Sequence, residues 1–291
     1  MKTVGRGVRV RSGSPGVRLA STSGEMPGTA LEELYVHYNR FEHIHPDPLE
    51  FVYLYDNKLD RELSGFIASS LAYGRVRQIL KSVGIVLDTM CPSPSRFLLE
   101  EPVDRIHKAF DHFRHRFTSG AMLSSLLEGL RELLIEYGSL ESCFQAGLHP
   151  GDENILPGLA EFVEKLEQAG GRKMPMFLPS PEGGSACKRL NLFLRWMVRK
   201  DNVDPGVWHS IPESFLIVPL DTHMHRIAKA MGLTSRNQAD MRCAVEITAA
   251  FGSIRPTDPV RYDFALTRLG IQAGTPSTDL FDSFPAIGGM G

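Results

Sequence analysis

Apolar residues recur every three or four positions along most of the chain, which is the spacing of one buried helix face. This spacing predicts helices over 31–41, 48–59, 60–72, 76–89, 121–137, 154–168, 187–199, 222–231, 239–251 and 260–269. Glycine and proline separate the segments, and the sequence shows no series of alternating strands and no fixed-period repeat. We therefore predict an all-α fold with about ten helices.

The two ends of the chain lack this periodicity. Residues 1–27 are rich in Gly, Ser and Arg and predict a disordered basic tail, although such a start is also typical of a transit peptide. Residues 272–291 contain Gly, Pro and Ser and predict a flexible tail. The folded domain is expected over 28–271, as one large domain or two lobes that share a cleft.

Composition narrows the class of protein. Hydrophobic residues make up 42% and charged residues 23% of the chain, and no apolar run is long enough to span a membrane. Its net charge of −2 means that a nucleic-acid surface would have to be local. The cysteines are too far apart for an iron–sulfur cluster or a disulfide scaffold, so we expect a cytoplasmic protein; they are Cys91, Cys143, Cys187 and Cys243.

A glycine-bearing turn leads into the helix predicted at 187–199. Gly183 and Gly184 would let backbone N–H groups approach a phosphate, and the start of a helix favours an anion. Lys188 falls in the first turn of this helix, where an amine is a candidate nucleophile. The alternative is a solvated surface lysine beside a loop.

A second candidate lies where the apolar segment Phe215–Leu220 meets the helix predicted at 222–231. Asp221 is a natural N-cap for that helix, and its carboxylate is placed to stabilise a nearby positive charge. The alternative is a cap without any chemical role.

The same segment also permits a metal site. In an extended chain His223 and His225 would point the same way, as they do at the zinc site of amidohydrolases. That barrel fold needs far more chain after the motif, and on a helix the two rings would diverge by about 200°. A metal-dependent hydrolase is therefore the less favoured alternative, and we expect neither a metal nor another cofactor.

The two segments together resemble the helix-hairpin-helix superfamily of DNA glycosylases, which includes endonuclease III and oxoguanine glycosylases. The hairpin of that superfamily typically reads Leu-Pro-Gly-x-Gly-x-Lys-x-Ala-Asn, and a longer hairpin here matches it at Leu178-Pro179, Gly183-Gly184, Lys188 and Asn191. The second element typically reads Val-Asp-Thr-His-x-x-Arg-Val and is matched over 220–227. Residues 262–270 resemble the closing helix, and 65–75 resemble the segment whose loop enters the DNA.

Residues 30–271 as a whole are similar to a bacterial family known only as a domain of unknown function. One departure from endonuclease III is a longer spacer between Lys188 and Asp221, which includes residues 200–211. The archaeal oxoguanine glycosylases carry a comparably long spacer. The resemblance therefore favours that branch of the superfamily and, with it, an oxidised purine as the substrate.

The resemblance implies a two-lobed all-α repair enzyme that excises a damaged base from double-stranded DNA, with Lys188 as the nucleophile and Asp221 as its partner. The Schiff base that such a lysine forms would add an AP-lyase activity. The implied DNA-binding residues are Gly183, Gly184, Ser185, Tyr73, Arg75, Arg77 and Arg226, and the implied base-pocket residues are Trp208 and His223. We expect a monomer associated with the nucleoid; the alternative is a helix-hairpin-helix protein that binds DNA without cleaving it.

Two of these assignments, and one further feature of the sequence, have alternatives in ordinary packing. The arginines after Tyr73 are also typical of a surface loop, and Trp208 is equally suited to a core position. The segment Phe110–Phe117 interleaves basic and aromatic residues as stacking surfaces do. The spacing of its phenylalanines favours a helix that buries Phe110, Phe113 and Phe117.

Overall fold

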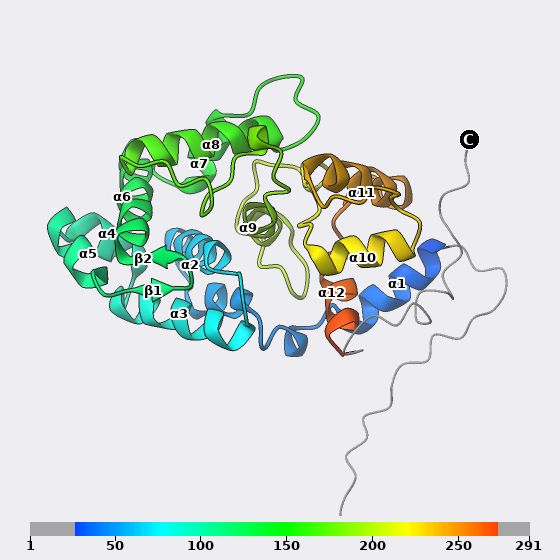
Figure 1. Ribbon diagram of the computed structural model, residues 1–291, viewed down its shortest axis with the longest axis horizontal. Coiled ribbons are helices and arrows are strands. Elements are labelled where there is room, and N and C mark those ends of the chain that lie inside the picture. Colours follow the sequence, from blue (N-terminus) through cyan, green and yellow to red (C-terminus); the bar gives the residue numbers. More distant parts are fainter. Residues whose placement is uncertain (1–26, 273–291) are drawn as a thin grey trace, which may run out of the picture.

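The computed structural model describes residues 27–272, and this part of the chain is mostly helical (Figure 1). In chain order the α-helices are α1 (Pro27–Tyr38), α2 (Lys58–Ser70), α3 (Val76–Thr89), α4 (Pro94–Glu100), α5 (Val103–Phe110), α6 (Gly120–Tyr137), α7 (Leu140–Ala146), α8 (Leu156–Ala169), α9 (Lys188–Val198), α10 (Thr222–Ala230), α11 (Met241–Ile254) and α12 (Asp263–Gln272). Short 3-10 helices are η1 (Phe41–His43), η2 (Pro48–Leu54), η3 (Pro181–Gly183) and η4 (Glu213–Phe215). The predicted all-α class is confirmed.

Helix α9 lies between two groups of helices (Figure 1). Helices α2–α8 form one group, and the other consists of α1 and α10–α12, although α1 is far from the rest in sequence. Within the described residues no helix is long and apolar enough to cross a membrane. The tails predicted at 1–27 and 272–291 fall outside the described residues except for their innermost residue.

The long helices follow the apolar periodicity closely. The leucine stripe of 121–137 forms the buried face of α6, which packs against α8. Segment 48–59 is an exception, because residues 48–54 form the 3-10 helix η2 and α2 begins at Lys58. The pattern also missed α4, α5 and α7, since helices of seven or eight residues contain barely two turns in which a period can show.

Residues 110–119 depart from the helix that the phenylalanine spacing favoured. Helix α5 ends at Phe110, and two short antiparallel strands follow, β1 (Arg114–His115) and β2 (Thr118–Ser119). Phe110 is buried, whereas Phe117 lies in the two-residue turn of this hairpin and is exposed. The expected burial of Phe117 on a helix is therefore wrong, because Arg116 adopts a left-handed conformation (φ 50°) that turns the chain back.

The packing of α6 on α8 depends on a glycine. A Cβ atom on Gly129 would lie 2.5 Å from the carbonyl oxygen of Leu166 on α8, so only glycine allows this approach of the two backbones. Gly84 on α3, in contrast, has open space where its Cβ would be. Gly129 and Gly84 are thus a matched pair of helical glycines: the first is in tight contact with a neighbouring helix, and the second is not.

We expect Gly129→Ala to lower the free energy of unfolding by about 1–3 kcal/mol through overpacking. Gly84→Ala should instead raise it by about 0.5–1 kcal/mol, because alanine loses less backbone entropy in a helix. Guanidinium denaturation of both variants measures the difference. Equal changes at the two positions would contradict the close contact of α6 and α8.

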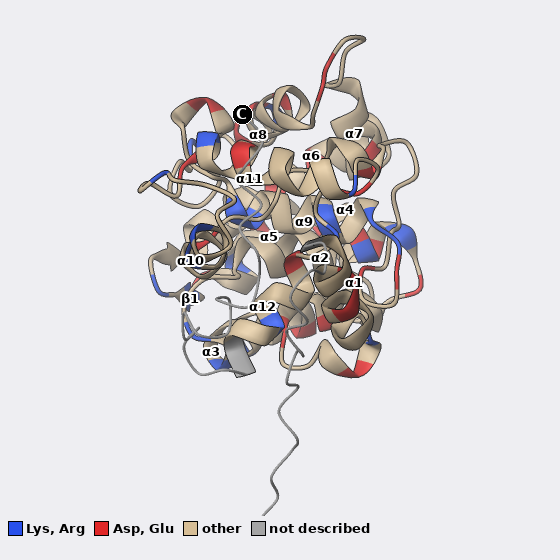
Figure 2. Cartoon of the chain, turned by 90° about the vertical axis from the view of Figure 1, so that its right-hand side faces the viewer, with Lys and Arg blue, Asp and Glu red and all other residues tan. Residues whose placement is uncertain are grey.

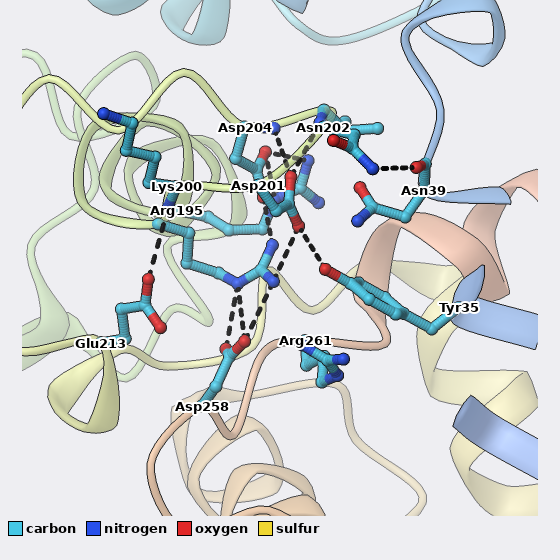
Figure 3. A network of polar contacts seen from close by, with 12 residues as sticks. Tyr35, Asn39, Arg195, Lys200, Asp201, Asn202, Asp204, Glu213, Asp258 and Arg261 are labelled. Carbon is cyan, nitrogen blue, oxygen red and sulfur yellow. Dashed lines mark hydrogen bonds and ion pairs between the residues drawn. The ribbon is translucent and has the colours of Figure 1, made fainter.

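The spacer after α9 carries carboxylates that neutralise Arg195 on that helix (Figure 3) and Arg199, the C-cap residue that follows it. Arg195 pairs with Asp204, and Arg199 pairs with both Asp201 and Asp204. The hydroxyl of Tyr35 on α1 donates to Asp201 at 3.0 Å, which ties the first helix to the same network. Burial raises the pKa of Asp204 to about 6, against the lowering effect of the Arg195 and Arg199 guanidinium groups. The spacer is thus a structural part of the core.

The far end of the spacer is held by two glutamates. Glu62 on α2 accepts the indole N–H of Trp208 at 2.7 Å, and burial raises the pKa of this carboxyl. Glu141 on α7 accepts the amides of His209 and Ser210 at 2.6 and 2.8 Å and pairs with Lys58. Burial alone would raise the pKa of Glu141, but Lys58 and these amides lower it to about 2.

The lowered pKa of Glu141 predicts a specific acid sensitivity. The carboxylate stabilises the fold above its unfolded-state pKa of about 4.5, and this stabilisation is lost as the pH falls toward 2. Glu141→Gln should therefore lower the free energy of unfolding at pH 7 and make its decline below pH 4.5 shallower. Urea denaturation over a pH series measures this, with Glu132→Gln on the exposed face of α6 as control. An unchanged slope would refute the assigned role of Glu141.

Candidate active site

Helix α9 begins immediately after a tight turn that sets the direction of Lys188. Gly184 adopts a left-handed conformation (φ 75°), and Cys187 adopts another (φ 47°) as the N-cap residue of α9. The side-chain amide of Asn191 donates to the carbonyl of Ala186 at 3.0 Å and so fastens the turn to the helix. The backbone of Gly184 accepts the amide of Met241 at 3.1 Å, which fixes the turn against the start of α11.

Asp221 is the N-cap of α10, as its place in the sequence predicts. Its Oδ1 atom accepts the backbone N–H groups of His223 and Met224, both at 2.9 Å. The apolar segment before it is buried from Leu216 to Leu220, so the chain reaches the surface only at Asp221. This arrangement leaves the second carboxylate oxygen of Asp221 available outside the cap.

The structure brings the two candidate residues together. The Nζ atom of Lys188 lies 3.6 Å from Oδ2 of Asp221, and their side chains are 32% and 34% exposed. One oxygen of Asp221 thus caps α10 while the other faces the amine. Each residue stands at the first turn of its own helix, and both remain open to a ligand from solvent.

A buried carboxylate lies behind this pair. Asp263, at the start of α12, pairs with Arg195, which is two turns further along α9 than Lys188. Burial raises the pKa of Asp263, Arg195 lowers it, and the charges of Asp221 and Lys188 also act on it. Neither Arg195 nor Asp263 was predicted as a site residue. The seven-residue interval from Lys188 to Arg195 places these two residues on one face of α9, which was the available signal for Arg195.

The turn before α9 differs from a phosphate cradle in one respect. The N–H groups of Gly183 and Gly184 donate to the carbonyls of Ser180 and Pro181, at 3.1 and 2.9 Å. These two donors close the 3-10 turn and are therefore not free for a phosphate. The sequence had led us to expect that they would be. Gly183, Gly184 and Ser185 are exposed, and their contact with DNA stays a prediction.

The histidines of α10 diverge, as a helix requires. His223 is exposed and contacts the guanidinium group of Arg226 at 3.0 Å, whereas His225 contacts the carbonyl of Arg236 at 2.9 Å. No group of three or more metal-binding side chains is found among residues 27–272. The geometry of these two rings gives no support to the metal-hydrolase alternative. Arg226 and His223 both lie within the first turn and a half of α10, next to Asp221.

The loop after α2 is connected to the helix of Lys188. The guanidinium group of Arg189 lies 4.9 Å from the centre of the Tyr73 ring and donates to the carbonyl of Ser70 at 2.8 Å. Arg75 and Arg77 are exposed beyond this contact. The Tyr73 ring itself is held by its neighbours and does not project freely, so insertion of that ring into a duplex finds no support in this arrangement.

Trp208 has the core position that the sequence left open as its alternative. It is 1% exposed, and its ring packs against Phe193 and Phe144 with centroid distances of 5.3 and 5.7 Å. Its indole N–H is already bonded to Glu62. The structure therefore gives Trp208 a packing role, and we do not propose it for a base pocket.

Charges of both signs are interspersed over the end of the molecule that holds α1, α10 and α12 (Figure 2). No single sign dominates this face, in agreement with the net charge of −2. A nucleic-acid surface must therefore depend on a local group of cations rather than on the field of the whole protein.

Comparison with known proteins places the chain in a family. Residues 47–272 match the family described as protein of unknown function (DUF2400), and because the match covers most of the chain, the chain belongs to this family. No curated protein and no solved structure matches the chain significantly. The relationship to helix-hairpin-helix glycosylases therefore stays a prediction from the motifs.

The two tasks of Asp221, capping and charge pairing, can be separated by substitution. Asp221→Ala should lower the free energy of unfolding by about 1 kcal/mol, because α10 loses its cap. Asp221→Asn should remain close to the wild type, since asparagine caps equally well while removing the charge beside Lys188. Chemical denaturation measures the free energy of unfolding of both variants. Asp240→Ala, which removes the N-cap of α11, is the control for the loss of a cap alone. If asparagine costs as much as alanine, the charge rather than the cap stabilises this position.

Proposed function

We propose that the protein is a DNA glycosylase with an associated AP-lyase activity, and that Lys188 and Asp221 carry out its chemistry. The proposal is supported most directly by the 3.6 Å distance between the Lys188 amine and the Asp221 carboxylate, at a partly exposed junction of two helix starts. Lys188 and Asp221 occupy the positions of the lysine and the aspartate in the two motifs that resemble those of the glycosylase superfamily. An oxidised purine in double-stranded DNA is the favoured substrate.

The reaction begins with a nucleotide extruded from the duplex, which presents its C1′ atom to the site. Asp221 first accepts a proton from the Lys188 ammonium group, and the neutral nitrogen forms a bond to C1′ as the bond to the base breaks; the base leaves with the electron pair and takes up a proton. Loss of a second proton from the nitrogen, breaking of the C1′–O4′ bond and uptake of a proton by O4′ then give a Schiff base with the opened sugar. Asp221 stabilises the cationic sugar and accepts or returns protons at the amine.

The non-catalytic alternative uses the same surface differently. In a protein that only grips DNA, Lys188 would bind a phosphate and Asp221 would act solely as a cap. The close pairing of Lys188 with a carboxylate argues against this alternative, because a neighbouring anion competes with a phosphate for the amine. We accordingly favour the catalytic function, exercised by a monomer in the cytoplasm at the nucleoid.

Borohydride trapping tests the proposal directly. With duplexes that carry oxoguanine or an abasic site, the wild type should form a covalent adduct that survives denaturing electrophoresis, since borohydride reduces the Schiff base. Lys188→Ala should abolish the adduct, and Asp221→Asn should slow its formation by about a hundredfold or more. Lys229→Ala removes an exposed lysine of α10 and should leave the adduct unchanged.

Thermal melting of each variant shows that it is folded before trapping is compared. Absence of an adduct, together with no base release over a panel of damaged duplexes, would refute the enzyme. Base release by Lys188→Ala without any adduct would instead indicate a glycosylase in which Asp221 directs a water molecule.

A further inference from the structure

The tip of the β1–β2 hairpin presents an aromatic ring to solvent. Phe117 is 43% exposed, and its ring stacks on Tyr73 with a centroid distance of 4.4 Å and an angle of 17° between the planes. Near-parallel stacking leaves one face of an exposed ring as a flat apolar surface. Phe117 and Tyr73 come from segments far apart in the sequence, so the stack is a product of the fold.

The lower ring of this stack is firmly held. The Tyr73 hydroxyl donates to the carbonyl of His115 at 2.8 Å and accepts from the hydroxyl of Thr118 at 2.6 Å. The His115 ring in turn contacts Ser82 at 2.9 Å and the carbonyl of Tyr73 at 3.1 Å. Because these hydrogen bonds hold the Tyr73 ring in place, Phe117 stacks on a preorganised support.

Two arginines lie beside the stack, and two more follow Tyr73 closely in the chain. Arg116 lies against Gly74, where a Cβ atom would come within 2.9 Å of its side chain, and Arg116 and Arg189 are the charged groups that act on the Tyr73 hydroxyl. Arg75 and Arg77 come just after Gly74 in the chain, and both are exposed. Arg116 also keeps a left-handed backbone, a conformation that glycine or asparagine adopts at lower cost.

Arg189 has no carboxylate partner among the described residues. Its guanidinium group donates to the backbone carbonyls of Ser70 and Met176, at 2.8 and 2.7 Å, and lies over two aromatic rings. Burial lowers the pKa of this group, and no described carboxylate pairs with it. A ligand that brings negative charge to this side of the stack would balance it.

We propose that Phe117 is a stacking platform for an unpaired base of a nucleic-acid strand, whose phosphates lie along Arg75, Arg77 and Arg116. A flat exposed ring bordered by cations fits the alternation of bases and phosphates, and base–aromatic stacking tolerates any base. An acidic protein would use the cations but not the ring face. The proposal rests on the proposed function only in taking DNA as the ligand, and it does not depend on the chemistry of Lys188.

The test measures binding and stacking separately. A fluorescein-labelled oligothymidine reports affinity by anisotropy, and a duplex with an unpaired 2-aminopurine reports stacking by quenching of its fluorescence. Phe117→Ala should weaken binding about tenfold and abolish the quenching, whereas Phe117→Trp should retain both. Phe41→Ala is the matched control, because Phe41 is also exposed and contacts a tyrosine ring, Tyr53, at 5.0 Å; it should bind as the wild type does.

Each outcome decides the proposal. Equal binding by Phe117→Ala and the wild type, no binding of either probe by the wild type, or equally strong competition by a polyglutamate peptide would overturn it. Binding that depends on Phe117 supports it, even if no base is ever released and no adduct is trapped, in which case only the glycosylase proposal fails. If an adduct is trapped but binding does not depend on Phe117, the stacking proposal fails and the glycosylase proposal stands.

Discussion

Four carboxylates surround two arginines on one side of α9, and the position of the candidate site depends on this buried network. Burying a guanidinium group costs several kcal/mol unless ion pairs and hydrogen bonds compensate for lost water. The compensating groups come from the spacer, from Asp258 before α12 and from Asp263 on α12. Helix α9 therefore cannot shift relative to these segments without exposing an unpaired charge, and Lys188 at its first turn is fixed with it.

The composition of the network also affects the electrostatics of the site. Carboxylates outnumber guanidinium groups within it, and burial raises the pKa of both Asp204 and Asp263 while the arginines oppose this rise. The charges of Lys188 and Asp221 both act on Asp263, so the buried network and the candidate pair are electrostatically coupled. Under the proposed function, a sugar cation or an iminium ion that forms at this pair would lie near the carboxyl group of Asp263.

Sequence reasoning succeeded where local structure decides the outcome. The long amphipathic helices and the cap at Asp221 depend on spacing and on a neighbouring turn, and both were predicted. It failed where contacts between distant segments decide the local structure. The phenylalanines of 110–117 have helical spacing, yet the segment forms a hairpin in which Phe117 stacks on Tyr73. The partners of Arg195 and the burial of Trp208 likewise depend on segments that a helical period cannot bring together.

Arg189 connects the helix of the candidate site to the hairpin. It follows Lys188 directly in α9, yet its guanidinium group lies over Tyr73, the ring on which Phe117 stacks. If both proposals hold, a strand bound at Phe117 and at Lys188 would pass near Arg189, and its phosphates would offer this arginine the negative charge that no described carboxylate supplies. Arg195 and Arg199 each pair with carboxylates, whereas Arg189 pairs with none among the described residues. This difference is the reason to test Arg189 as a contact for the proposed strand.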